Sequence, residues 1–193
     1  MRLVCYAGTH FKKYFSTDMT TLFRNLALLI SGLTLFISPL VAAQSAAPAK
    51  ASKYRGAYFE VKYPSNFTAR SLDAAKPRES SAATFSAPDG SMEFYIFSPQ
   101  WAGDAPGIAL VPAKETEVAR KSENGKSSGV AGAFTWTTIA AKDKSYTRVY
   151  QSFLAEDKSI NWVIGMKYSS EAALATYRAQ YAQFKASLVQ LAD

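Results

Sequence analysis

The stretch Phe85–Trp101, FSAPDGSMEFYIFSPQW, decides the fold of this chain. At its centre, Pro88 to Gly90 is a strong turn signal, because proline presets its own φ and glycine takes a positive φ freely. The flanking segments 82–86 and 91–98 have the length and composition of strands. The stretch therefore predicts a β-hairpin.

The second strand of this hairpin is apolar on both faces. Successive side chains of a strand point to opposite sides, so Met92, Phe94 and Ile96 lie on one face while Tyr95 and Phe97 lie on the other. A strand buried on both faces belongs in the middle of a sheet that is covered on each side. We therefore expect a sheet with further strands on both sides of this one.

Other segments extend the sheet into an antiparallel meander. Upstream, YFEVKY at 58–63 alternates apolar and polar residues, and a short strand is expected near 69–72. Downstream, the predicted strands are 116–122, 131–141, 146–155 and 160–168. The turns between them are ENGK, KDKS and EDKS, with Asn124-Gly125 as a favoured two-residue hairpin turn.

The chain ends in a predicted helix. Ser169 or Ser170 can cap it, and Glu171 lies in the first turn, where a negative charge suits the helix dipole. Apolar residues recur at helical spacing in one stripe, namely Leu174, Tyr177, Tyr181, Phe184, Leu188 and Leu191. We expect this stripe to cover one face of the sheet, which gives an α+β fold, in preference to forming a coiled coil.

The segment Leu26–Ala43 reads as the apolar part of a secretory signal. It carries no charge, follows Arg24, and ends in Pro39 and a small-residue box typical of a cleavage site. We expect cleavage of residues 1–43, with Met19 as an alternative start; a retained membrane anchor is the competing interpretation. Residues 44–53 are predicted as a disordered linker and 54–193 as a single domain.

Cleavage at this point would change the chemistry that the protein can perform. The only cysteine and the only histidine, Cys5 and His10, lie upstream of the cut. The mature chain would then have no thiol or imidazole for nucleophilic catalysis and no ordinary zinc ligands. We therefore predict no catalytic residues, no metal site and no cofactor.

The net charge gives little support to nucleic-acid binding. The full chain has 22 basic and 15 acidic residues, and removal of residues 1–43 leaves 18 basic against 14 acidic ones. The basic residues are scattered among acidic ones, whereas a nucleic-acid surface needs a concentrated basic face. We expect no nucleic-acid partner, and no stable membrane insertion once the leader is removed.

The order of these features resembles the PsbP and Mog1 superfamily. The similarity rests on the exported chain, FEVKYPSNF at 59–67, the hairpin FSAPDGSMEFYIFSP, the following hairpins and a final helix with QFKASLVQL. The resemblance implies an α/β/α sandwich and action by binding or assembly. Such proteins usually have an early helix, which here only 65–76 or 99–112 could supply.

Three residues are candidates for a binding surface. The connection Pro99–Pro112 is long and rich in proline and glycine, and loops of this kind in compact domains tend to be functional or mobile. Trp101 and Asp104 lie in this loop, and Tyr95 lies on the strand before it. Trp101 could anchor a partner or stack on a sugar; otherwise it covers one end of the sheet.

Other notable residues have structural explanations of equal or greater weight. Trp136 and Trp162 lie within strand patterns and are expected in the core. Tyr146, Arg148 and Tyr150 are expected on an exposed sheet face. Glu93 and Asp104 would be the carboxylates of a hydrolase, but nothing in the sequence fixes the separation that such a pair needs.

The sequence thus favours an exported, non-catalytic protein of the periplasm or cell envelope that binds a protein or envelope component. A carbohydrate-binding or small-ligand-binding module that uses Trp101, Tyr95 and Asp104 is the alternative. A hydrolase that works through carboxylates is the third hypothesis.

Overall fold

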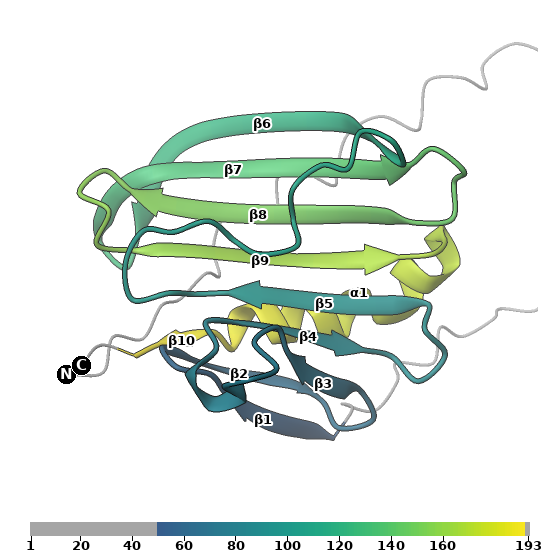
Figure 1. The fold of residues 1–193 in the computed structure, drawn as a ribbon, viewed down its shortest axis with the longest axis horizontal. Coiled ribbons are helices and arrows are strands. Elements are labelled where there is room, and N and C mark those ends of the chain that lie inside the picture. The colour runs from purple at the N-terminus through teal and green to yellow at the C-terminus, as the bar shows by residue number, and fades with distance from the viewer. Residues whose placement is uncertain (1–49, 192–193) are drawn as a thin grey trace, which may run out of the picture. The chain divides into compact units, whose positions relative to one another are not determined.

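The computed structural model describes residues 50–191; the predicted leader and residues 44–49 of the predicted linker lie outside this range. The elements are, in chain order, β1 (Ala51–Arg55), β2 (Phe59–Pro64), β3 (Thr68–Ser71), the short 3-10 helix η2 (Pro77–Glu79), β4 (Ala82–Ser86), β5 (Met92–Phe97), β6 (Glu115–Ser127), β7 (Val130–Ala141), β8 (Thr147–Ala155), β9 (Asn161–Tyr168), α1 (Glu171–Ala186) and β10 (Val189–Gln190). Figure 1 shows their arrangement.

The larger sheet has seven antiparallel strands in the order β3-β4-β5-β9-β8-β7-β6. The chain reaches β6 by a long loop after β5 and returns strand by strand, so that β9 pairs with β5 (Figure 1). The meander therefore closes against β5, and β3 and β6 form the edges of the sheet. Apart from β6, the predicted strands of this sheet are confirmed to within one residue at each end.

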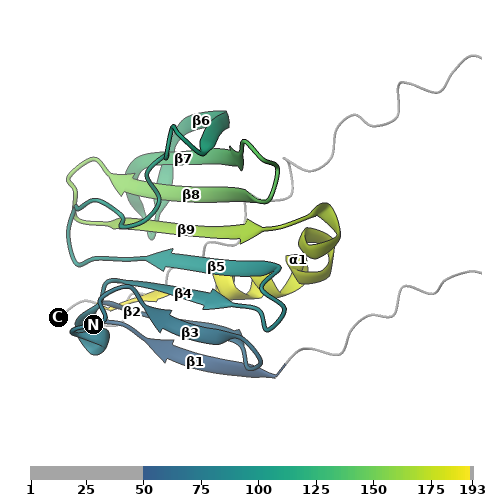
Figure 2. The same ribbon diagram turned by 45° about the vertical axis from the view of Figure 1, so that its right-hand side comes forward.

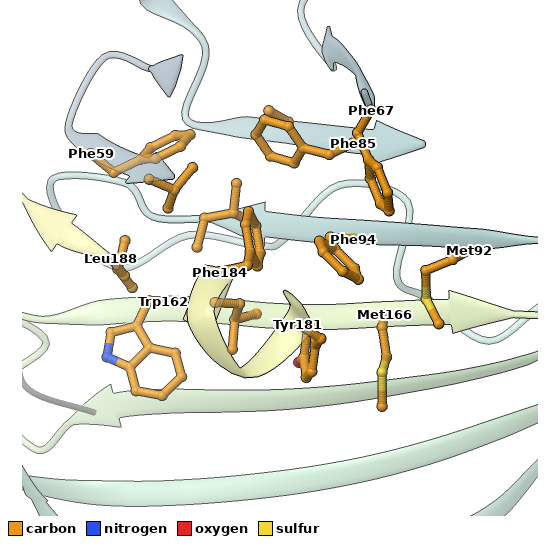
Figure 3. Close-up of a cluster of buried hydrophobic side chains, with 14 of the residues drawn as sticks. Phe59, Phe67, Phe85, Met92, Phe94, Trp162, Met166, Tyr181, Phe184 and Leu188 are labelled. Carbon is orange, nitrogen blue, oxygen red and sulfur yellow. The ribbon is translucent and has the colours of Figure 1, made fainter. Parts of the chain in front are cut away.

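The burial of β5 on both faces is confirmed. Met92, Phe94 and Ile96 lie in the main core, while Tyr95 and Phe97 lie in a second, smaller cluster on the opposite face. Figure 3 shows the main core, where Phe94 contacts Phe184 of the helix with ring centroids 5.1 Å apart. The apolar pattern of one strand thus places a layer on each side of the sheet.

On the main-core face the layer is α1. Ser170 caps the helix as predicted, because its hydroxyl accepts a hydrogen bond from the N–H of Ala173 at 3.2 Å. Tyr181 and Phe184 are buried, and Leu174 and Tyr177 pack at the margin of the core. The helix covers β5, β9 and β2, and β6 to β8 extend beyond it (Figure 2). The predicted α+β fold with a covering C-terminal helix is confirmed.

The opposite face of the sheet has a different cover. Among residues 50–191, α1 is the only α-helix, and the segments 65–76 and 99–112 form β3 and an irregular loop in place of an early helix. The second layer is this loop, residues 98–114, which crosses β9, β8 and β7 on the side away from α1 (Figure 1). The loop takes the place of the second helical layer that an α/β/α sandwich would have.

A small second sheet, β1-β2-β10, forms where the chain enters and leaves the described part. β1 begins at Ala51, so residues 51–53 belong to the fold and not to a disordered linker. Their backbone pairs with β2 at Pro64, Tyr63 and Lys62, and this pairing orders a segment whose side chains gave no strand signal.

The predicted turn at Asn124-Gly125 is wrong. Both residues lie inside β6, and the chain turns at Ser128 and Gly129, which have φ of 53° and 83°. Two successive positive φ values suit a tight hairpin turn. Gly125 has another role, because a Cβ atom there would lie 2.8 Å from the ring of Phe134. The glycine makes room for an aromatic ring.

Three other turns share one construction. In the sequences DGS, DKS and DKS, the aspartate accepts a hydrogen bond at 3.0 Å from the N–H of the serine two residues on. The middle residues, Gly90, Lys144 and Lys158, have φ of 68°, 63° and 61°. The side chain of aspartate thus closes each turn while the middle residue adopts a left-handed conformation.

We predict that Gly90→Ala lowers the free energy of unfolding by about 1 kcal/mol, because an L-residue is strained at positive φ. No atom lies within 4 Å of the added methyl group, so the effect reports the backbone alone. Urea denaturation measures it. Gly103→Ala is the matched control, since its φ is not positive and its nearest neighbour is 3.9 Å away. Equal losses in both variants would contradict the explanation.

Candidate binding surface

The loop of residues 98–114 is held against the sheet by hydrogen bonds from side chains to its backbone carbonyls. The amide of Asn161 donates to the carbonyl of Gly103 at 3.0 Å, and the hydroxyl of Tyr95 donates to that of Pro106 at 2.9 Å. Arg148 donates to the carbonyls of Gly107 and Ala109 at 3.0 and 2.9 Å. Only Ala105 and Ile108 pack against the smaller cluster, so these polar contacts fix the path of the loop.

Arg148, which makes two of these hydrogen bonds, also belongs to a buried ion pair. Arg148 of β8 and Glu115, the first residue of β6, are 6% and 4% exposed, and a guanidinium N–H of Arg148 donates to the carboxylate of Glu115. The hydroxyl of Tyr146 and the N–H of Val111 donate to the same carboxylate at 2.7 and 2.8 Å. Arg148 also donates to the hydroxyl of Tyr150 at 3.1 Å.

These contacts set the charge state of Glu115. Burial by itself would raise the pKa of the carboxyl group, but the hydrogen bonds from Tyr146, Val111 and Arg148 outweigh it and hold the pKa below its ordinary value. Glu115 therefore stays ionised at neutral pH, with both oxygens occupied. This carboxylate supports the loop and is poorly placed to donate a proton to a substrate.

Trp101 is the most exposed large apolar side chain of the described residues, with 64% of its surface accessible. It projects from the braced loop beside Tyr58, with ring centroids 6.3 Å apart and planes inclined by 40°. Trp101 therefore does not pack over the end of the sheet, which was the alternative interpretation of this residue. The exposed ring of Trp101 and the half-buried ring of Tyr58 form an aromatic pair, which we call the aromatic end.

The three predicted site residues do not come together. Tyr95 lies beneath the loop, is 6% exposed, and has a pKa raised by burial, so it supports the loop and does not reach the surface. Asp104 is exposed in the same loop as Trp101. Glu93 is half-buried and accepts a hydrogen bond from Ser86 at 3.1 Å. Only Trp101 and Asp104 remain on one accessible segment.

The prediction of an exposed face at Tyr146, Arg148 and Tyr150 is wrong. Arg148 and Tyr150 are buried and Tyr146 is half-buried, because the loop covers them. Gly165 of β9 makes space here, since a Cβ atom at this position would lie 2.2 Å from the ring of Tyr150. Trp162 lies in the core as expected and is 2% exposed, whereas Trp136 lies outside both clusters, half-buried on β7 and stacked on Phe134.

Two features gave no signal in the sequence. Lys185 of α1 is buried and donates to the side-chain carbonyl of Gln151 at 3.1 Å; burial lowers its pKa to about 8. A shallow hollow of about 390 Å³ lies between the end of β2 and the last turns of α1, lined by Lys62, Tyr63, Gln180 and Gln183 among others. Lys185 lies next to the apolar stripe, and only the docking of the helix buries it.

Within residues 50–191, the His, Cys, Asp and Glu side chains form no group of three that could hold a metal ion. Over the same range, no helix is long and apolar enough to cross a membrane. The apolar segment Leu26–Ala43 lies outside this range.

We predict that Glu115→Gln lowers the free energy of unfolding at pH 7 by about 3 kcal/mol or more, because it leaves the buried charge of Arg148 without a counter-ion. The lowered pKa sets the pH dependence. The stabilisation from the carboxylate is complete above the ordinary value of 4.5 and is lost as the pH falls through the folded-state pKa. The difference between wild type and variant should therefore shrink in acid.

Denaturation at several pH values and amide hydrogen exchange of residues 98–114 measure this effect. Glu117→Gln is the matched control, because Glu117 pairs with Arg120 at the exposed edge and its loss should leave stability almost unchanged. If exchange in the loop is as slow in Glu115→Gln as in wild type, the ion pair does not hold the loop.

Comparison with known proteins gives matches among solved structures alone. No family model and no curated protein matches the chain. A protein from Bacteroides thetaiotaomicron VPI-5482 is 12% identical with a TM-score of 0.40; the match covers 75% of this chain and 49% of that one, so the chain spans about half of its length. The Ran-binding protein Mog1p of Saccharomyces cerevisiae is also 12% identical, with a TM-score of 0.32 and coverage of 72% of this chain and 88% of Mog1p. The likeness to Mog1p concerns the fold alone.

Proposed function

We propose that this protein is exported to the periplasm or cell envelope and binds a protein or another envelope component without catalysing a reaction. One observation carries the binding part of this proposal: Trp101 is 64% exposed on a loop that buried hydrogen bonds hold in place. The backbone close to Trp101 is already held, because Asn161 donates to the carbonyl of Gly103, so less backbone entropy is lost on binding, and tryptophan is enriched among residues that dominate binding energy.

The polar groups of the described residues support binding over catalysis. The buried carboxylate of Glu115 is occupied by three donors, and Arg148 is occupied by the loop. Glu93 is bonded to Ser86, and Asp104 is exposed in the loop. A carboxylate hydrolase needs two carboxyl groups held across a substrate, and no arrangement of these side chains favours it.

A carbohydrate ligand is the second candidate. Trp101 and Tyr58 present neighbouring ring surfaces, and Asp104 on the same loop offers a hydrogen-bond acceptor. Aromatic rings beside a carboxylate suit a sugar, whose ring has an apolar face and hydroxyl groups at its edge. Tyr58 is half-buried, which leaves a sugar little of this ring to stack on, and we rank a sugar below a protein partner.

We predict that Trp101→Ala weakens binding to a purified envelope partner by about 30-fold, the size of a hot-spot residue, while the melting temperature changes by less than about 2 °C. Binding is measured by interferometry with the partner first captured by wild-type protein. Val118→Ala, at a residue of the edge strand β6 that is 63% exposed, is the matched control and should bind like wild type. Unchanged affinity in Trp101→Ala would remove Trp101 from the binding surface.

A tryptophan fluorescence change with a cell-wall glycan, absent in Trp101→Phe, would favour the carbohydrate alternative.

Export is tested separately. We predict that the protein recovered from the envelope fraction begins near Gln44, because the small-residue box ends at Ala43. Intact mass and N-terminal sequencing measure this. Arg substitutions at Leu28 and Leu35 should block processing by interrupting the apolar run. A cytoplasmic protein with the leader intact would contradict the export proposal and leave the binding proposal open.

A further inference from the structure

Exposed aliphatic residues mark a second surface at the far end of the same loop. Leu110 and Val111 are 38% and 46% exposed. The backbone of Val111 is fixed on both sides, because its N–H donates to Glu115 while its carbonyl accepts from the N–H groups of Lys114 and Glu115 at 2.9 and 2.8 Å. Two aliphatic side chains are therefore held at the surface by a rigid turn.

Lysines surround this turn. The N–H of Lys142 donates to the carbonyl of Lys114 at 2.9 Å, and the ammonium of Lys142 donates to the carbonyl of Pro112 at 2.7 Å. Lys144 lies two residues further, in the exposed turn between β7 and β8. Leu110, Val111, Lys114, Lys142 and Lys144 together form what we call the lysine corner.

The carboxylates near the lysine corner do not balance its charge. Glu115 is neutralised by Arg148, and Glu117 is paired with Arg120 at 2.8 Å. Asp143 is the remaining acidic residue of the turn and accepts hydrogen bonds from Ser145. Within residues 50–191, Lys114 and Lys144 have no ion-pair partner. The corner is therefore positively charged around an apolar centre.

The lysine corner and the aromatic end lie at opposite ends of the large sheet. Trp101 follows the end of β5 that pairs with the start of β9, whereas the β7–β8 turn lies beside the end of β9 at Tyr168. In Figure 1 the loop crosses the sheet from one end to the other. The two surfaces can therefore be occupied at the same time.

From this chemistry we propose that the lysine corner attaches the protein reversibly to an anionic lipid bilayer. Exposed aliphatic side chains can enter the boundary between headgroups and acyl chains, and lysines around them bind anionic headgroups. A bilayer suits the corner better than an acidic protein, because a stable protein interface buries at least about 1,000 Å² in total and this surface is a single turn with its neighbours. The proposal is independent of the partner at the aromatic end.

Flotation of the mature chain with lipid vesicles tests this proposal. We expect binding to vesicles with about 30% phosphatidylglycerol at low salt and little binding to pure phosphatidylcholine. Binding should be lost at about 500 mM salt, since screening shortens the range of the attraction. Lys144→Glu should weaken binding by at least about fivefold, and Leu110→Ser with Val111→Ser should weaken it at every salt concentration at which the wild type binds.

Two matched controls separate the lysine corner from general charge and apolarity. Lys158 occupies the same DKS turn with nearly the same φ at the other end of the sheet, so Lys158→Glu changes the net charge equally and should float like wild type. Leu154→Ser is the control for the aliphatic pair. Trp101→Ala should also float like wild type, which distinguishes this proposal from the proposed function.

Equal flotation with neutral and anionic vesicles, no flotation at all, or equal losses in Lys144→Glu and Lys158→Glu would each overturn the proposal. Binding to polyglutamate without binding to vesicles would identify a site for an acidic protein and would overturn it as well. Circular dichroism of each variant establishes that it is folded before flotation is compared.

Discussion

The loop of residues 98–114 depends on one buried guanidinium group. Arg148 cannot remain charged beneath the loop unless a counter-ion and acceptors surround it, because an isolated buried charge is strongly unfavourable. Glu115 supplies the charge, and the carbonyls of Gly107 and Ala109 supply the acceptors. The bonds that Arg148 makes to these groups therefore fix a segment that has no regular secondary structure. Both proposed surfaces are carried by this segment.

The cover of the sheet explains why such bonds are needed. On the α1 side, Phe184 and Tyr181 fill the space above Phe94 with apolar side chains. On the other side, the loop brings only Ala105 and Ile108 to the smaller cluster, so apolar burial alone holds it weakly. Polar contacts have to supply the rest. They are directional, and they fix the positions of individual residues more closely than apolar packing would.

Local patterns in the sequence account for most of the strands and the helix. The alternation in 58–63, the turn at Pro88 to Gly90, and the cap at Ser170 each act over a few residues, and each was confirmed. The turn predicted at Asn124-Gly125 was wrong because a glycine can be required for either of two reasons. The sequence does not distinguish a backbone that needs a positive φ from a position that must leave space for the ring of Phe134. Local patterns thus predicted secondary-structure elements, but they did not explain why each residue occupies its position.

The candidate surfaces were less predictable, because they depend on contacts between distant positions. Arg148 and Glu115 are 33 residues apart, and each alone resembles an ordinary surface charge. Tyr95 was proposed as a binding residue from its place before the loop, although the apolar pattern of its own strand predicted a cover on that face, and the loop is this cover. Trp101 was expected in an irregular loop and lies in one, since its place follows directly from the prolines and glycines around it; its role in binding stays a prediction.

The two ends of the loop are mechanically connected by this arrangement. Gly103, close to Trp101, is bonded to Asn161, and Val111 in the lysine corner is bonded to Glu115; Arg148 holds the carbonyls between them. A ligand that shifted the backbone at either end would strain the hydrogen bonds of Arg148. The free-energy cost of this strain would also affect ligand binding at the other end. Binding at the two ends would then be coupled to the extent that either one moves the loop, and a loop that stays fixed would leave them independent.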